Sequence, residues 1–112
     1  MNTPEEIVQR QLDYYNENNL EAFISTYHGD VEILNLEDNV LVLKGLDALR
    51  EKYRERFEIQ KVKAELVNRI VIGDKVIDHE HVSGIKSGEI VKAVAVYKVE
   101  GTKIKRVWFL YE

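Results

Sequence analysis

From Lys61 to Glu112 the sequence reads as four consecutive strands, and this feature restricts the possible folds more than any other. Apolar residues recur at every second position through most of this stretch. Turn residues separate the segments, which we place at 61–72, 76–83, 89–99 and 103–111. Consecutive antiparallel strands that follow helices indicate an α+β fold with the helices on one face of the sheet. We therefore expect a small cone-shaped domain that encloses a pocket.

The first 60 residues predict three helices and a hairpin. Thr3 followed by Pro4 and two glutamates is a typical helix start, and the first helix ends near residue 16. A second helix is expected over 20–27, ended by His28-Gly29-Asp30. A hairpin over 31–43 and a third helix from Leu46 to about Phe57 follow. We interpret the charged residues of this third helix as a solvent-facing surface.

Composition excludes several classes of function. The 112 residues suit one domain, 1–112, and the absence of cysteine excludes disulfides, thiolate catalysis and cysteine-based zinc sites. A formal net charge of −4 argues against nucleic acid as a partner. The start of the sequence lacks a secretion signal, and no apolar run approaches the roughly 18–20 residues of a membrane helix. We therefore expect a cytoplasmic protein with no membrane partner.

Alternation along the strands predicts which side chains face the pocket. In 89–99, the set that contains Ala93, Ala95 and Tyr97 carries no charge and should face inward. In 76–83, we place Asp78 and Glu80 on the outer face, where they can pair with lysines of the next strand. This register puts His79 and His81 on the inner, concave face.

The order of helices, hairpin and long strands resembles the nuclear transport factor 2-like superfamily, which includes ketosteroid isomerases and polyketide cyclases of the SnoaL type. The resemblance covers essentially the whole chain and implies a cystatin-like cone, with a curved antiparallel sheet wrapped around the N-terminal helices. The residues that carry it are Gln9-Arg10, Tyr14-Tyr15-Asn16, Asn19-Leu20-Glu21-Ala22-Phe23, Tyr27-His28-Gly29-Asp30-Val31-Glu32 and Lys44-Gly45-Leu46-Asp47-Ala48-Leu49.

The catalytic set that the resemblance implies for a ketosteroid isomerase is replaced in this chain. Asn35 stands at the position of the carboxylate base, Gln11 at that of the oxyanion tyrosine, and Ala95 at that of the protonated aspartic acid. Asparagine cannot shuttle a proton as aspartate does, and alanine donates no hydrogen bond. We therefore do not expect steroid isomerisation by this mechanism.

His79 and His81 admit several interpretations. They can form a general acid–base pair, orient a ligand as polar lining, or be hydrogen-bonded, half-buried histidines. A metal site normally needs a third ligand, and none has a diagnostic spacing, so we expect neither metal nor cofactor.

The leading hypothesis is a domain that binds a small, partly apolar molecule and acts on it as a cofactor-independent isomerase, cyclase or hydratase. The alternative is a non-catalytic binding or dimerisation module. Besides the two histidines, the candidate ligand-binding residues are Gln11, Tyr14, Asn35, Tyr53, Phe57, Ala95, Phe109 and Tyr111.

The outer face of the sheet predicts a homodimer interface, because apolar side chains gather there with charges around them. The resemblance implies the same pairing. The candidate interface residues are Val94, Val96, Arg106, Trp108 and Leu110, with Asp78, Glu80, Lys92 and Lys98 as the surrounding charges.

Overall fold

The computed structural model describes residues 3–85 and 88–112, and it contains the three helices, the hairpin and the four long strands that the sequence predicts. In chain order the elements are α1 (Pro4–Asn16), α2 (Leu20–Ser25), β1 (Tyr27–Asn35), β2 (Leu41–Lys44), α3 (Leu46–Glu55), the π-helical turn η1 (Arg56–Gln60), β3 (Lys63–Ile72), β4 (Lys75–Ser83), β5 (Val91–Glu100) and β6 (Lys103–Tyr111).

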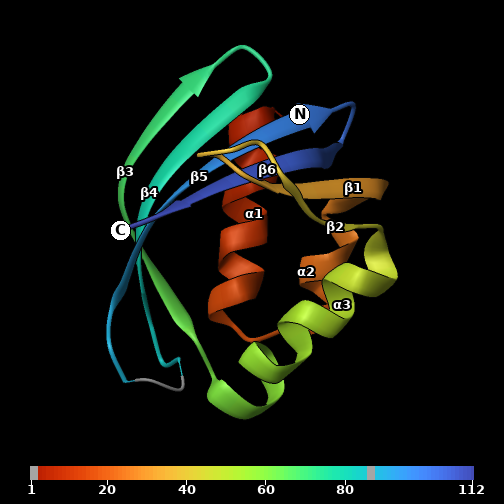
Figure 1. Ribbon diagram of the computed structural model, residues 1–112. Helices are drawn as coiled ribbons and strands as arrows, with labels where there is room; N and C mark the ends of the chain where they lie inside the picture. The colour runs from red at the N-terminus through yellow and green to blue at the C-terminus, as the bar shows by residue number, and fades with distance from the viewer. Residues whose placement is uncertain (1–2, 86–87) are drawn as a thin grey trace.

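The strands form one curved sheet around the helices. Its order is β2-β1-β6-β5-β4-β3. Figure 1 shows β3, β4 and β5 bending past α1, with α2 and α3 on the same side of the sheet. All neighbouring strands are antiparallel except β1 and β6, which run parallel, so the expectation of a purely antiparallel sheet is wrong at this pair. No hairpin joins β1 to β6, and so no tight turn imposes an antiparallel direction on them.

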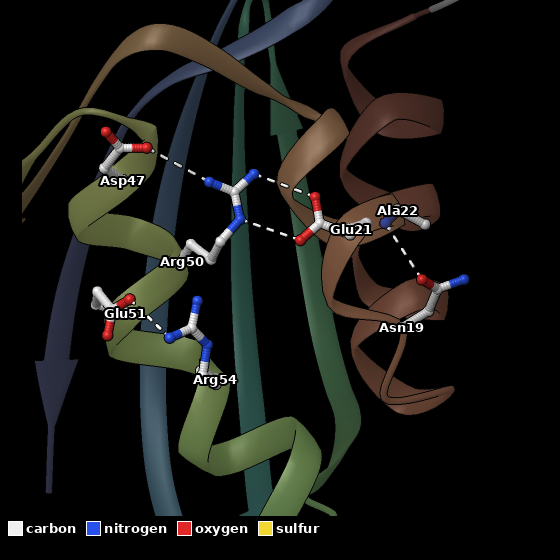
Figure 2. Close-up of polar contacts among 7 residues, drawn as sticks. All are labelled: Asn19, Glu21, Ala22, Asp47, Arg50, Glu51 and Arg54. Carbon is white, nitrogen blue, oxygen red and sulfur yellow. Dashed lines mark hydrogen bonds and ion pairs between the residues drawn. The ribbon is translucent and has the colours of Figure 1, made fainter.

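Hydrogen bonds to side chains fix where the N-terminal helices begin. Thr3 and Glu6 form a reciprocal capping box at α1, in which the Thr3 hydroxyl accepts from the Glu6 amide at 3.2 Å. At α2 the Asn19 side chain accepts from the Ala22 amide at 3.2 Å, as Figure 2 shows. The helix start at Thr3 was predicted from the sequence.

The second helix is shorter than predicted. It ends at Ser25. Tyr27, expected as its last residue, and His28-Gly29-Asp30, expected to terminate it, already belong to β1. Thr26 explains the difference, because its hydroxyl donates to the Phe23 carbonyl at 2.7 Å and its own carbonyl accepts from the Ile104 amide at 2.9 Å. The chain therefore enters the sheet immediately after Thr26.

A cluster of aromatic rings fills the space between the helices. Phe23 lies at the centre, with ring centroids 4.9 Å from Tyr53, 5.0 Å from Phe57 and 5.1 Å from Tyr27. Tyr15 contacts the same cluster. Burial of this many rings supplies a large part of the hydrophobic stabilisation.

The inward face of β5 is the one that the sequence predicts. Ala93, Ala95, Tyr97 and Val99 are buried, and the alternate residues are not.

The predicted orientation of β4 is wrong. Asp78 and Glu80 are buried at 0% and 6% exposure, whereas His79 and His81 lie half-buried on the opposite, convex face. The register explains this result: Lys92 lies opposite His81 and Lys98 opposite Lys75, so neither lysine faces an acidic residue of β4. Side chains alternate between the two faces of a strand, so assigning one of them to the wrong face misplaces all four.

Candidate functional site

A cavity opens between α1, the α3–η1 segment and the concave face of the sheet. Counting its open mouth, it contains about 400 Å³ of empty space, and the centre of a water molecule fits in about 30 Å³ of it. That smaller volume holds only a few waters, so a ligand must be slim or must displace side chains at the mouth. The lining residues are Gln11, Leu12, Tyr15, Tyr53, Arg56, Ala64, Glu80, Val82, Ala93, Tyr97, Phe109 and Tyr111.

Glu80 is the acidic group of the cavity wall. It is 6% exposed, and no ion pair within residues 3–85 and 88–112 includes its carboxyl. Burial, reinforced by the negative charge of Asp78, raises its pKa to about 7, and Arg69 acts in the opposite direction. A carboxyl with this pKa gives and takes protons near neutral pH.

Asp78 lies on the same face of β4 but is paired with a cation. The Arg69 guanidinium donates to both of its carboxylate oxygens, at 2.7 and 2.9 Å, and also donates to the Gln9 side-chain oxygen at 2.8 Å. Asp78 is fully buried, so this bidentate pair offsets the cost of removing its charge from water. The two neighbouring acids of β4 thus have different environments, one paired with a cation and one open to the cavity.

Gln11 extends from α1 into the cavity lining. It is 4% exposed, and its side-chain oxygen Oε1 is buried without a hydrogen-bond partner in the described part of the chain. Such a buried acceptor costs roughly 1–3 kcal/mol. A donor on a bound molecule would remove this cost.

Tyrosine hydroxyls and one arginine form the opposite part of the wall. The guanidinium carbon of Arg56 lies 5.4 Å from the centre of the Tyr53 ring, and its charge acts to lower the pKa of Tyr15 and Tyr111. Burial raises the pKa of Tyr15 to about 12, against the influence of Arg56, so this hydroxyl stays protonated at neutral pH. The cavity therefore presents neutral hydroxyls, a cation and one titratable carboxyl.

Comparison with known families identifies the fold family. The family model described as the SnoaL-like domain matches residues 8–107. The chain is a member of the SnoaL-like family. It thereby falls in the nuclear transport factor 2-like superfamily, as the sequence motifs predicted. No curated protein matches this SnoaL-like domain.

Solved structures share the complete fold. An uncharacterised cystatin-fold protein from Novosphingobium aromaticivorans is 25% identical, with a TM-score of 0.85 and coverage of 96% of this chain and 97% of that one. A proposed polyketide cyclase from Sinorhizobium meliloti is 21% identical, with a TM-score of 0.79 and 94% of each chain covered. A proposed ketosteroid isomerase from Kribbella flavida is 13% identical, with a TM-score of 0.82 and coverage of 97% and 77%. The SnoaL-like domain thus has the cystatin-like cone.

Half of the predicted ligand-binding residues line the cavity of this SnoaL-like domain. Gln11, Tyr53, Phe109 and Tyr111 do so. Asn35 lines an adjoining hollow that shares Phe109 and Tyr111 with the cavity. Tyr14, Phe57 and Ala95 are not in the lining, because Phe57 and Ala95 are fully buried in the core and Tyr14 packs against the outside of that core.

The prediction that His79 and His81 point into the cavity is wrong. Their rings are 5.3 Å apart in an edge-to-face arrangement on the convex face, where His79 lines shallow hollows together with Val94. The Nδ1 atom of His81 lies 3.8 Å from a Glu65 carboxylate oxygen. Neither histidine can exchange a proton with a ligand in the cavity, so we drop both from the site.

The predicted interface residues share the convex face. Cross-strand pairing joins Val96 to Trp108 and Val94 to Leu110, and Arg106 lies one step further along β6. The surrounding charges differ from the prediction, since Asp78 and Glu80 are inside. The convex acids include Glu32, which binds Arg106 at 2.8 Å.

Sequence reasoning missed the two charged groups of the cavity, Glu80 and Arg56. A signal for the first existed: a hairpin over Gly73-Asp74 places Ile72 opposite Lys75, and counting back puts Arg69 opposite Asp78. That pairing would have marked Asp78 as a buried, neutralised acid and Glu80 as its neighbour on the concave face. Arg56 was hidden in the charged run of the third helix.

In residues 3–85 and 88–112, no three His, Cys, Asp or Glu side chains come together as a metal site would require. In the same residues, no helix has the length and apolar character needed to cross a membrane.

Proposed function

We propose that this SnoaL-like domain binds a small, partly apolar molecule in its cavity and that Glu80 exchanges a proton with it. The observation that carries the proposal is a buried carboxyl in the cavity wall, in no ion pair of the described residues, with its pKa raised to about 7. A general base is most effective when its pKa lies near the working pH. Apart from Gln11 and Arg56, the rest of the wall is apolar or aromatic, which suits the body of such a ligand.

The reaction that fits this arrangement begins at a carbon atom next to a carbonyl group. Ionised Glu80 removes a proton from that carbon, and the electron pair moves onto the carbonyl oxygen as an enolate. Protonated Glu80 then returns the proton to a different atom of the ligand, so that Glu80 ends the cycle ionised. Isomerases, cyclases and hydratases all use steps of this kind.

Similar proteins support the reaction class but not a substrate. The solved structures with this fold include a proposed polyketide cyclase and a proposed ketosteroid isomerase. Ketosteroid isomerisation is not expected here, since Asn35, Gln11 and Ala95 replace the residues that it uses and each lost oxyanion donor costs roughly 10²–10³ in rate. Glu80 is a different carboxyl on a different strand.

Deuterium exchange tests the proposal without knowledge of the substrate. Small cyclic and aryl ketones are incubated with the protein in D₂O, and NMR follows deuterium incorporation beside the carbonyl group. We expect exchange above the buffer rate that follows a midpoint near pH 7 and is lost in Glu80→Gln. Glu58→Gln is the matched control, because Glu58 is exposed on η1 and outside the cavity lining. Equal exchange by Glu80→Gln and the unchanged protein would exclude Glu80 as the proton-transfer group.

We further propose that the protein pairs with a second copy through the convex face. The support is an apolar group formed by Val94, Val96, Trp108 and Leu110, of which Leu110 is 39% exposed. Clusters of this kind on a folded surface generally mark an interaction site. Pairing would leave the cavity accessible, because the cavity opens on the other side of the sheet.

A further inference from the structure

The charged residues of α3 and η1 separate into two faces with different partners. On the outward face, Arg50 binds Glu21 at 3.0 and 3.1 Å and Asp47 at 3.4 Å, and Arg54 binds Glu51 at 2.8 Å (Figure 2). Each arginine of this face therefore has a carboxylate.

Lys52 and Arg56, one helical turn apart, lie on the inward face and have no carboxylate. No ion pair of the described residues includes either of them. Arg56 lines the cavity, and Lys52 lines the adjoining hollow, with Tyr111 and Phe109 common to both. Burial and the charge of Arg56 lower the pKa of Lys52, as expected where two cations approach each other without an anion.

We infer that the cavity takes a single-ring carboxylic acid, whose carboxylate is bound by Arg56 and Lys52 and whose ring carries a hydrogen-bond donor for Gln11 Oε1. The inference rests on the proposed use of the same cavity and names its ligand class. A planar guanidinium can bind both oxygens of a carboxylate at once.

Gln11 supports the second part of this description. Its Oε1 atom is an acceptor, is buried and lacks a partner in the described chain, so a ligand that offers only acceptors would leave it unsatisfied. A ring hydroxyl or amine would satisfy it.

The overall charge of the protein makes Lys52 and Arg56 important for attracting an anionic ligand. The formal net charge is −4, so the protein as a whole repels anions, and local attraction must come from this pair. Glu80 does not cancel it, since the charges that shift the Glu80 pKa most are those of Asp78 and Arg69. An acid bound at Arg56 therefore leaves Glu80 available to the body of the ligand.

Matched ligands test the inference at pH 7 by calorimetry and protein NMR. The probes are 4-hydroxybenzoate, its neutral analogue 4-hydroxybenzamide, and benzoate, which lacks the hydroxyl donor. We expect 4-hydroxybenzoate to bind at least tenfold more tightly than the amide and several-fold more tightly than benzoate. Arg56→Gln and Lys52→Gln should each reduce the preference for the acid, and Gln11→Leu should remove the preference for the hydroxyl.

Arg54→Gln is the control, because it removes a cation from the outward face of the same helix and should leave both preferences unchanged. Equal or tighter binding of the amide, or an acid preference that survives in both Arg56→Gln and Lys52→Gln, would overturn the inference. So would the absence of binding by the acid up to about 10 mM.

The outcome is separable from that of the proposed function. Glu80→Gln should still bind 4-hydroxybenzoate more tightly than the amide. Retained deuterium exchange in the same variant would therefore refute only the role of Glu80 and not the assignment of an acid. Tight binding of neutral rings together with Glu80-dependent exchange would refute only the assignment of an acid.

Discussion

At the scale of single residues, the cavity depends on how β4 accommodates two buried acidic side chains, Asp78 and Glu80. Arg69 donates to both carboxylate oxygens of Asp78 and so offsets the cost of burying that group, whereas burial raises the pKa of Glu80 and favours its protonated form. The pattern of polar and apolar residues in β4 does not by itself predict that the two acids are buried. Alternation rules place charged residues outside, and they fail where a cross-strand arginine or a protonated carboxyl makes burial possible.

Glu80 should make the stability of the fold depend on pH. Its pKa rises from 4.5 to about 7 on folding, so folding takes up a proton between these values. The contribution of Glu80 to the free energy of unfolding should then be largest below pH 4.5. This contribution should fall by about 3 kcal/mol as pH rises through 7. Glu80→Gln should flatten this slope in urea titrations at pH 5 and pH 8, whereas Glu58→Gln should keep it. Identical slopes for all three proteins would contradict the raised pKa of a buried Glu80.

The Arg69–Asp78 pair should tune Glu80 in opposite directions when either partner is removed. Asp78→Asn removes a negative neighbour and frees the Arg69 charge, so the Glu80 midpoint should fall; Arg69→Met should raise it. Arg69→Met should also cost about 3–5 kcal/mol of stability, because it leaves Asp78 buried and unpaired. Shifts of the same sign in both variants, measured by carboxyl ¹³C NMR, would rule out this arrangement.

At the scale of elements, the sequence predicted the helices, the hairpin and the long strands because their signals are local. The caps at Thr3 and Asn19 and the turns at Gly73 and Gly101 depend only on neighbouring residues. The parallel β1–β6 pairing and the π-helical turn after α3 depend on contacts distant in sequence. That turn carries Arg56, and irregular helical turns often occur at functional sites.

Asn16 joins two elements that form one end of the cavity. Its side chain donates to the Ala64 carbonyl at 2.9 Å and accepts from the Ala64 amide at 2.7 Å, which fixes the end of α1 to the start of β3. Asn16→Ala should therefore cost roughly 1–3 kcal/mol in urea unfolding, because it removes both bonds. Asn16→Asp, which keeps the acceptor but lacks the donor, should lie between. A cost below a few tenths of a kcal/mol for Asn16→Ala would show that these two bonds do not hold α1 in place.

At the scale of the whole molecule, the sheet separates a cavity on its concave side from an apolar group on its convex side. Trp108 is the largest side chain of that group, and its indole nitrogen donates to the Asn39 side chain at 3.0 Å. Trp108→Glu should convert a dimer to a monomer in light scattering at micromolar concentration, since a charge at the centre of an apolar interface is costly. Arg106→Gln, at the edge, should have a smaller effect. A monomeric unchanged protein would refute the pairing.

Carboxyl-detected NMR of ¹³C-labelled protein measures directly whether Glu80 titrates near neutral pH inside the cavity. Glu80→Gln assigns the signal by its disappearance. We predict one glutamate signal with a midpoint of about 7 that is absent from the variant. A Glu80 signal that titrates near 4.5, as an exposed glutamate does, would contradict the account.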